Sequence, residues 1–374
     1  MTGPTSGQFI ESTNGQSAPF VIRQPIQGDS AILIKPEGGY QIMTDNGFGS
    51  RSNSADALLG FFDISIDWRT GSGGTGRVTL DKVTRLSDPD ERAGFRITAA
   101  NTNYPNGQNN IPVDPAIRSG RLLTGYDFDT ESFRRVADGT YWFGEEFGPS
   151  LIHTDANGKL LEPPFPLGGV RAPENLAGDR ANLSSSRGFE GMALNGSGTK
   201  LYPMLEGTVQ GDPAGTLRIM EFDLATKSYT CNRFRYRMEA ATNAIGDFTA
   251  VNDRQFLVIE RDGGQGATAL FKKIFLIDIE TVTDGNVRKT EVLDLLNIAD
   301  PLDLNGDGSF AFRFPFLTIE GVAVVNRSTL LVTNDNNYPF STGRRPDQAD
   351  NNEFILVDLG ELLPEPVPAP APVR

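Results

Sequence analysis

The chain has 374 residues, and its formal net charge of −14 at pH 7 argues against nucleic acid and anionic membranes as partners, because both would repel an acidic protein. No apolar stretch approaches the roughly 18 to 20 residues that are needed to cross a bilayer. The single cysteine, Cys231, excludes an internal disulfide.

The composition, with 41 glycines and 24 prolines, fits a turn-rich all-β protein with a hydrophobic core. Residues 1–16 are rich in Gly, Ser, Thr and Asn, so we expect a flexible segment there. We expect one domain over residues 17–362. Residues 363–374 are rich in proline and predict an extended tail.

Short strand-like runs recur five times along the domain, separated by turn residues. In each repeat one carboxylate opens an apolar run, and a second carboxylate closes the run that follows. The two acids are 16, 14, 16, 13 and 15 residues apart, in chain order. In that order the pairs are Asp29 and Asp45, Glu131 and Glu145, Glu190 and Glu206, Asp247 and Glu260, and Glu320 and Asp335.

Repeats of several short strands, with a period of roughly 40 to 60 residues, are typical of β-propellers. The sequence therefore predicts an all-β propeller of five clear repeats, with five or six blades around a central acidic channel.

Two segments break the repeat. Residues 87–125 have turn chemistry without alternation, and they are either a degraded extra blade or an insertion over one face. Residues 296–316 contain DLNGDG at 303–308, which begins like a calcium-binding loop, but the twelfth position of that loop is Phe314 instead of Glu. This second segment is either a separate calcium site or a solvated turn.

The recurring acids predict a metal site. Innermost strands line a propeller channel, so matching residues of successive repeats form a ring, and crowded carboxylates raise one another's pKa unless a cation neutralises them. Oxygen ligands suit Ca²⁺, or Mg²⁺ or another hard cation, and the absence of a His or Cys cluster argues against zinc. Alternatively, the acids only cap turns. The candidate ligands are Glu131, Glu145, Glu146, Glu190, Glu206, Asp247, Glu260, Glu320 and Asp335.

Few cationic side chains lie near these acids in the sequence. An anionic substrate that is bridged by a metal and clamped by arginines would be a phosphate ester. We take Glu145, Arg187 and Arg261 as the candidate catalytic residues. The only histidine, His153, and the only cysteine are expected to be structural, which leaves little basis for a Ser-His-Asp triad.

The chain resembles the bacterial phytase-like family, also described as esterase-like activity of phytase. The resemblance spans roughly residues 20–360 and is carried by WFGEEFGPSLIHTD, SRGFEGMAL, FLVIERDGGQG, TIEGVAV and NDNNYPFS. It implies a propeller, phosphoester hydrolysis and an extracytoplasmic location, periplasmic or secreted, although no signal peptide is visible in MTGPTSGQF. Calcium-dependent propeller phytases and alkaline phosphatases, which it resembles more distantly, hold their metals with acids at the channel mouth.

We therefore expect a monomeric, metal-dependent hydrolase that acts on a small anionic phosphoric ester. Bound calcium would lower the pKa of a water molecule and neutralise the phosphoryl oxygens. Two alternatives stay open. One is a propeller lactonase or carboxylic esterase, and the other is a non-catalytic binding propeller in which calcium is structural.

Overall fold

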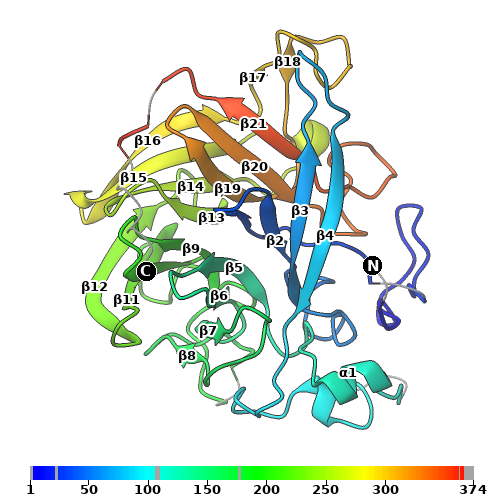
Figure 1. Cartoon of the computed structure of the whole chain (residues 1–374). Coiled ribbons are helices and arrows are strands. Elements are labelled where there is room, and N and C mark those ends of the chain that lie inside the picture. Colours follow the sequence, from blue (N-terminus) through cyan, green and yellow to red (C-terminus); the bar gives the residue numbers. More distant parts are fainter. Residues whose placement is uncertain (1–2, 22–23, 106–109, 176–177, 362, 366–374) are drawn as a thin grey trace.

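The structure, a computed structural model, describes residues 3–21, 24–105, 110–175, 178–361 and 363–365. Five antiparallel sheets dominate it, and each sheet comes from one contiguous stretch of chain (Figure 1). Blade 1 contains β1 (Ile32–Ile34), β2 (Tyr40–Met43), β3 (Gly60–Asp67) and β4 (Arg77–Arg85). Blade 2 contains β5 (Thr130–Arg135), β6 (Tyr141–Glu145), β7 (Ser150–Thr154) and β8 (Phe165–Pro166).

The remaining three blades follow in chain order. Blade 3 contains β9 (Phe189–Leu194), β10 (Lys200–Leu205), β11 (Thr216–Asp223) and β12 (Ser228–Arg237). Blade 4 contains β13 (Ala244–Ala250), β14 (Gln255–Arg261), β15 (Lys272–Thr283) and β16 (Asn286–Asp294). Blade 5 has three strands, β19 (Thr318–Asn326), β20 (Thr329–Asp335) and β21 (Phe354–Asp358).

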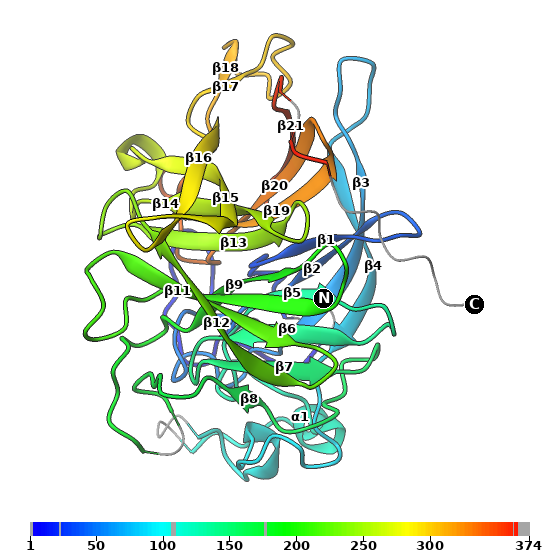
Figure 2. The same cartoon turned by 90° about the vertical axis from the view of Figure 1, so that its left-hand side faces the viewer.

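The innermost strands close into a ring. Strand β5 contacts β9, β9 contacts β13, β13 contacts β19, and β19 contacts β1. Blades 2 and 1 complete the circle through a shared hydrophobic cluster that includes Phe133 and Phe143 of blade 2 and Met43 and Phe61 of blade 1. The prediction of a β-propeller is confirmed, and the number of blades is five (Figures 1 and 2).

Burial follows the position of a strand within its blade. The second strand of blade 2, β6, is buried along its whole length, because other strands and neighbouring blades cover both of its faces. The outermost strands β4 and β12 are mostly exposed. Second strands accordingly carry apolar runs, such as FLVI in β14 and LLV in β20, whereas the outermost strands β4 and β12 carry many polar residues.

The described residues of the segment 87–125 pack against blades 1 and 2. They contain a 3₁₀ turn, η1 (Thr98–Ala100), and one short helix, α1 (Pro115–Gly120). Ile97 and Ile117 of this segment belong to the same core cluster as Phe61 and Phe133. The helix begins after Asp114, whose carboxylate accepts a hydrogen bond from the amide of Ala116. Within the described ranges, no helix has the length and hydrophobicity that crossing a membrane requires.

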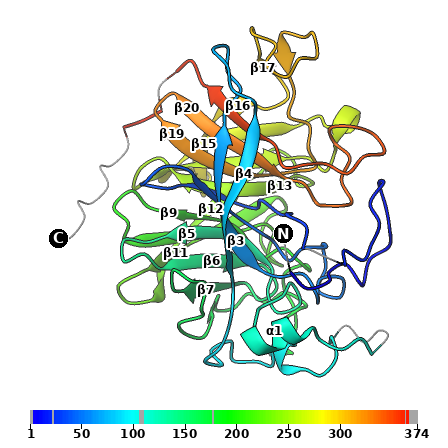
Figure 3. The ribbon, with the colours of Figure 1, turned by 45° about the vertical axis from the view of Figure 1, so that its right-hand side comes forward.

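The segment 296–316 forms a small hairpin of β17 (Ile298–Ala299) and β18 (Ala311–Phe312). It projects at the opposite end of the molecule from α1 in all three views (Figures 1 to 3). Its loop is exposed, and the Asp303 carboxylate accepts a hydrogen bond from the amide of Gly308. The tip of the β3–β4 hairpin supports the loop, since Arg69 donates to the carbonyl of Leu304.

Both ends of the described chain lie against the propeller. Near the N-terminus, Ser6 pairs with Phe20, and the side-chain amide of Asn14 donates to the carbonyl of Pro339. Near the C-terminus, Leu363 is buried in a core cluster of blades 4 and 5. Most of the expected proline-rich tail, residues 366–374, lies outside the described residues, as do residues 1–2.

Candidate functional site

A β-bulge interrupts four of the five innermost strands at the same place. In β5, β9 and β19 the extra residue, left without a partner in the ladder, is a glutamate: Glu131, Glu190 and Glu320 respectively. In β13 the irregularity contains Gly246 and Asp247. A bulge re-aims a side chain out of the regular alternation. The repeated carboxylate is therefore a built feature of the inner strands.

Glycines let these strands approach one another closely. A Cβ atom on Gly191, next to Glu190, would lie 2.6 Å from the Cβ atom of Phe248 on β13. A Cβ atom on Gly321, next to Glu320, would lie 3.1 Å from Cγ2 of Ile32 on β1. These distances leave little room for a side chain, so the tight ring depends on glycine after the acid.

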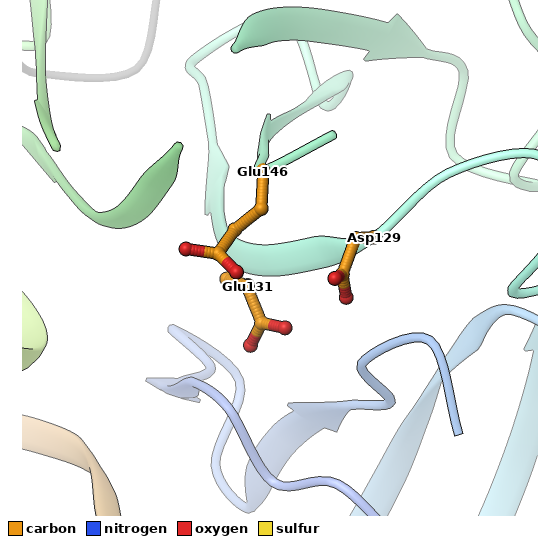
Figure 4. A group of neighbouring side chains, drawn as sticks. All are labelled: Asp129, Glu131 and Glu146. Atoms are coloured by element: carbon orange, nitrogen blue, oxygen red, sulfur yellow. The ribbon is translucent and has the colours of Figure 1, made fainter. Parts of the chain in front are cut away.

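Five buried carboxylates gather in the channel as two overlapping groups. Asp129, Glu131 and Glu146 form the first group, and Glu146 forms the second with Glu190 and Glu206. In each group one oxygen of every residue lies within 4.8 Å of the others. Figure 4 shows the three carboxyl groups of the first group turned toward one another. Glu146 belongs to both groups, so they form one continuous acidic cluster.

Two oxygens of this cluster are unsatisfied. Asp129 Oδ1 and Glu146 Oε1 are buried and accept no hydrogen bond within the described part of the chain. Such groups are costly to bury unless something replaces their water. Calcium takes six to eight oxygens at about 2.3–2.6 Å, so two oxygens on one ion lie at most about 5 Å apart. The spacing and the free oxygens therefore fit a hard divalent cation.

The raised pKa values of the clustered acids also indicate that a cation is needed to neutralise them. Burial raises the pKa of Glu190 well above its usual value, and Glu206 and Glu320 raise it further. Burial likewise raises the pKa of Glu146 and Glu131 well above the usual value, with added repulsion from neighbouring carboxylates. All five acids would ionise together only if a cation compensated their charge.

The acids of blades 5 and 1 extend the cluster. Burial raises the pKa of Glu320, Asp335 and Asp45 to about 8. Repulsion from Asp45 also raises the pKa of Asp335, and repulsion from Asp129 and Glu320 raises that of Asp45. Asp29 lies beside them, where its carboxylate accepts a hydrogen bond from the hydroxyl of Thr333. The acids of blades 1 and 5 thus lie beside the acidic cluster.

Two arginines contact the cluster. Arg261 Nη2 donates to Glu320 Oε1 at 2.8 Å and lies 3.7 Å from Glu206 Oε1 and 3.9 Å from Glu190 Oε1. Burial lowers the pKa of Arg261, but the three carboxylates outweigh burial and raise it overall. Arg187 Nη1 lies 2.5 Å from Glu206 Oε2, and 44% of its side chain is exposed. Arg261 is therefore a buried counter-charge, whereas Arg187 is open to an incoming anion.

Three candidate acids satisfy their oxygens elsewhere. Glu145 accepts hydrogen bonds from the amides of Phe147 and Gly148, both at 2.8 Å, and so fixes the turn after β6. Burial raises the pKa of Glu145 to about 7. Glu260 points between blades 3 and 4, where it accepts from the Tyr236 hydroxyl at 2.6 Å and pairs with Lys289 at 3.0 Å.

The third such acid, Asp247, belongs to an ion pair that spans the channel. Arg134 Nη2, from β5, donates to Asp247 Oδ1 at 2.7 Å and to the carbonyl of Phe248 at 2.9 Å. Strands β5 and β13 are separated by β9 in the ring, and both partners are buried. The amide of Val322 satisfies the other oxygen of Asp247. The pair therefore links three innermost strands, β5, β13 and β19.

Sequence reasoning missed Asp129. It lies two residues before Glu131, outside the repeated hairpin, and the available signal was the alternation of acids in DFDTE. Of the two residues that were expected to be structural, His153 is packed and hydrogen-bonded, whereas Cys231 is not buried. His153 stacks on Trp142 with ring centroids 4.2 Å apart and contacts Glu162 at 2.6 Å. Cys231 is exposed on β12.

Comparison with known proteins finds one matching family and solved structures of low sequence identity. A family model described as "Phytase-like: Esterase-like activity of phytase" matches residues 24–338. No curated protein matches the chain. Among solved structures, a GH43 β-1,3-galactosidase is 12% identical over 95% of this chain and 94% of its own, with a TM-score of 0.43. A calcium-binding protein, regucalcin, from Agrobacterium tumefaciens is 14% identical over 98% of both chains, with a TM-score of 0.39.

Proposed function

This chain belongs to the phytase-like family, and from that premise we propose that it is a metal-dependent hydrolase of phosphoric esters. The observation that carries the proposal is the acidic cluster, with its shared carboxylate Glu146 and its unsatisfied buried oxygens. An arginine that is open to solvent, Arg187, adjoins the same cluster. Carboxylates that can hold a metal ion, next to an arginine that can bind an anionic substrate, suit phosphoryl chemistry.

The residues that would hold the metal are Asp129, Glu131, Glu146, Glu190 and Glu206. Calcium is the first choice, because the site offers many carboxylates in an irregular arrangement, whereas magnesium requires near-octahedral geometry. When bound, the ion would lower the pKa of a coordinated water and neutralise phosphoryl oxygens.

The protein's own groups have distinct roles in this proposal. Arg187 orients the phosphoryl oxygens of the substrate, because its guanidinium lies at the cluster and is half exposed. Arg261 holds Glu320, Glu206 and Glu190 in fixed positions from the buried side. The pair of Arg134 and Asp247 links the innermost strands β5 and β13. No nucleophilic side chain is required.

A substrate panel tests the proposal. The calcium-loaded protein is assayed on an aryl phosphate monoester, a phosphodiester, a lactone and a short acyl ester. We expect turnover of a phosphate ester only, and a higher KM for it in Arg187→Gln than in the control Arg254→Gln, which changes an exposed arginine.

Two results would redirect the assignment. Turnover of the lactone without turnover of any phosphate ester would make the protein a propeller lactonase. A melting temperature that rises with calcium, without turnover of any ester, would make it a binding propeller with a structural ion.

A further inference from the structure

A cavity of about 320 Å³ is lined in part by sequence neighbours of two clustered acids, Asp129 and Glu146. Residues of the 87–125 insertion, of the β6–β7 turn and of the connection after β7 line it. Its apolar lining includes Phe95, Phe128, Phe147, Pro163, Pro164 and Pro166. Small-molecule sites are typically concave, apolar and about 300–1,000 Å³ in volume, with a few polar groups. This cavity is at the lower end of that range and suits a single ring.

The cavity and the acidic cluster share their wall. Asp129 and Glu146 belong to the cluster, and their neighbours in sequence, Phe128, Glu145 and Phe147, line the cavity. Consecutive Cα atoms are about 3.8 Å apart. The same two segments therefore carry both the clustered acids and part of the cavity lining, which places the cavity beside the cluster.

The connection between β8 and β9 links the two spaces as well. Glu174 lines the cavity, and its carboxylate contacts the hydroxyl of Ser185. The next residue, Ser186, donates to Asp129 Oδ2, and Arg187 follows at the cluster. One loop thus forms part of the cavity wall and also carries the arginine that is open to the substrate.

The polar groups of the cavity select against a highly charged occupant. Asp127, Glu145 and Glu174 line it together with two arginines, Arg51 and Arg171. Both arginines already donate to backbone carbonyls. A ring that carries several phosphates would meet three acids and little available positive charge.

Arg51, which lines the cavity, stacks on two aromatic rings. Its guanidinium lies over the rings of Phe147 and Tyr126, at 4.7 and 5.4 Å from their centroids. Arg51 Nε and Glu174 Oε2 are buried atoms that have no hydrogen-bond partner within the described residues. A donor and an acceptor at the edge of an aromatic cavity suit a ring with one polar substituent.

We propose that this cavity binds the aromatic alcohol part of the substrate, so that the enzyme acts on aryl phosphate esters in preference to polyphosphorylated rings. The proposal rests on the proposed function, because it assigns the second half of the same substrate.

Binding of non-hydrolysable ligands tests it by calorimetry on the calcium-loaded full chain. We expect phenylphosphonate to bind about 10- to 100-fold more tightly than methylphosphonate, because a ring is buried. The variant Phe95→Ala should lose most of this preference and keep the affinity for methylphosphonate. Phe310→Ala, which changes a phenylalanine that is 74% exposed, should behave like the wild type.

Phenol is the third ligand, and it separates the two proposals. Phenol binding that Phe95→Ala abolishes, without binding of either phosphonate, would support the cavity and overturn the proposed function. Equal affinities for the two phosphonates in the wild type would overturn the cavity and leave the proposed function standing. Failure of phenol and phenylphosphonate to bind would overturn the cavity assignment as well. If Phe95→Ala does not fold, Pro163→Ala, at an exposed position, gives the same comparison.

Discussion

At the scale of single residues, Glu146 is the carboxylate that joins the two groups of the site. It belongs to both groups of carboxylates, it is buried, and its Oε1 has no hydrogen-bond partner among the described residues. Its neighbour Glu145 has a different role, because amides of the β6–β7 turn occupy both of its oxygens. Glu145 positions Glu146, and Glu146 faces the channel.

Replacing Glu146 by Gln keeps its size and removes one negative charge. Calcium affinity depends on the number of charged ligands, so we expect Glu146→Gln to bind calcium at least about tenfold more weakly, and Glu190→Gln and Glu320→Gln to be weakened in the same direction. Calorimetric titration measures this. The control Glu11→Gln makes the same change at an exposed position. Equal affinities in all four variants would show that the acids only cap turns.

Arg261 should have the opposite effect on the metal. It is a buried cation within 4 Å of three carboxylates. Removing it increases the net negative charge of the site, so Arg261→Gln should bind calcium more tightly than the wild type while hydrolysis falls. The stability of its calcium-free form should also fall, because three carboxylates lose their partner. A decrease in calcium affinity would contradict this role. Arg254→Gln is the matched surface control.

At the scale of structural elements, the bulge decides which acids meet. The constant spacing of paired acids predicts the hairpin, and that prediction is confirmed in all five blades. Alternation along a strand sends consecutive residues to opposite faces, so one residue of register decides whether a side chain faces the channel. Glu260 and Arg261 are consecutive, yet only Arg261 faces the acids.

The parts of the site that the sequence could not predict follow from this geometry. The bulges at Glu131, Glu190 and Glu320 depend on packing between blades, which no single repeat contains. The neutralisation of Asp247 by Arg134 joins residues 113 positions apart. Asp129 precedes its strand and has no counterpart in the hairpin pattern. Fold, blade repeat and acidic character could be predicted, but the identity of the clustered acids could not.

The close approach of inner strands gives a prediction about stability. Gly191→Ala places a Cβ atom 2.6 Å from the Cβ atom of Phe248 and 2.9 Å from its amide nitrogen. We expect it to lower the free energy of unfolding by about 1–3 kcal/mol, and to weaken calcium binding because Glu190 must shift. Gly168→Ala is the matched control, since a Cβ atom there meets nothing within 4 Å. Denaturant unfolding that is the same for both variants would show that the strands can separate freely.

At the scale of the whole molecule, acidic side chains are concentrated at the centre of the protein. The chain has a net charge of −14, and its acidic cluster is buried in the channel. Asp45, Glu320 and Asp335 have a pKa of about 8 in the folded protein, against 3.8 for an ordinary Asp and 4.5 for an ordinary Glu. The folded state therefore binds more protons than the unfolded state between these values.

Stability without calcium should fall as pH rises from about 5 to 8. In this range the buried carboxylates of the folded protein stay protonated, whereas those of the unfolded chain ionise, so rising pH favours unfolding. Calcium stabilises the ionised carboxylates, so its stabilising effect should be larger at pH 8 than at pH 5. Thermal unfolding in EDTA and in calcium at the two pH values measures both effects. A melting temperature in EDTA that is the same at pH 5 and pH 8 would contradict the raised pKa values.

The central claim is that the acidic cluster holds the ion on which hydrolysis depends, and the most direct test is to titrate calcium back into exhaustively chelated protein while following hydrolysis of an aryl phosphate. We predict that turnover falls to the background rate after chelation and returns in proportion to bound calcium. Glu146→Gln should recover little of it at the same calcium concentration. Turnover that persists unchanged after exhaustive chelation would contradict the account.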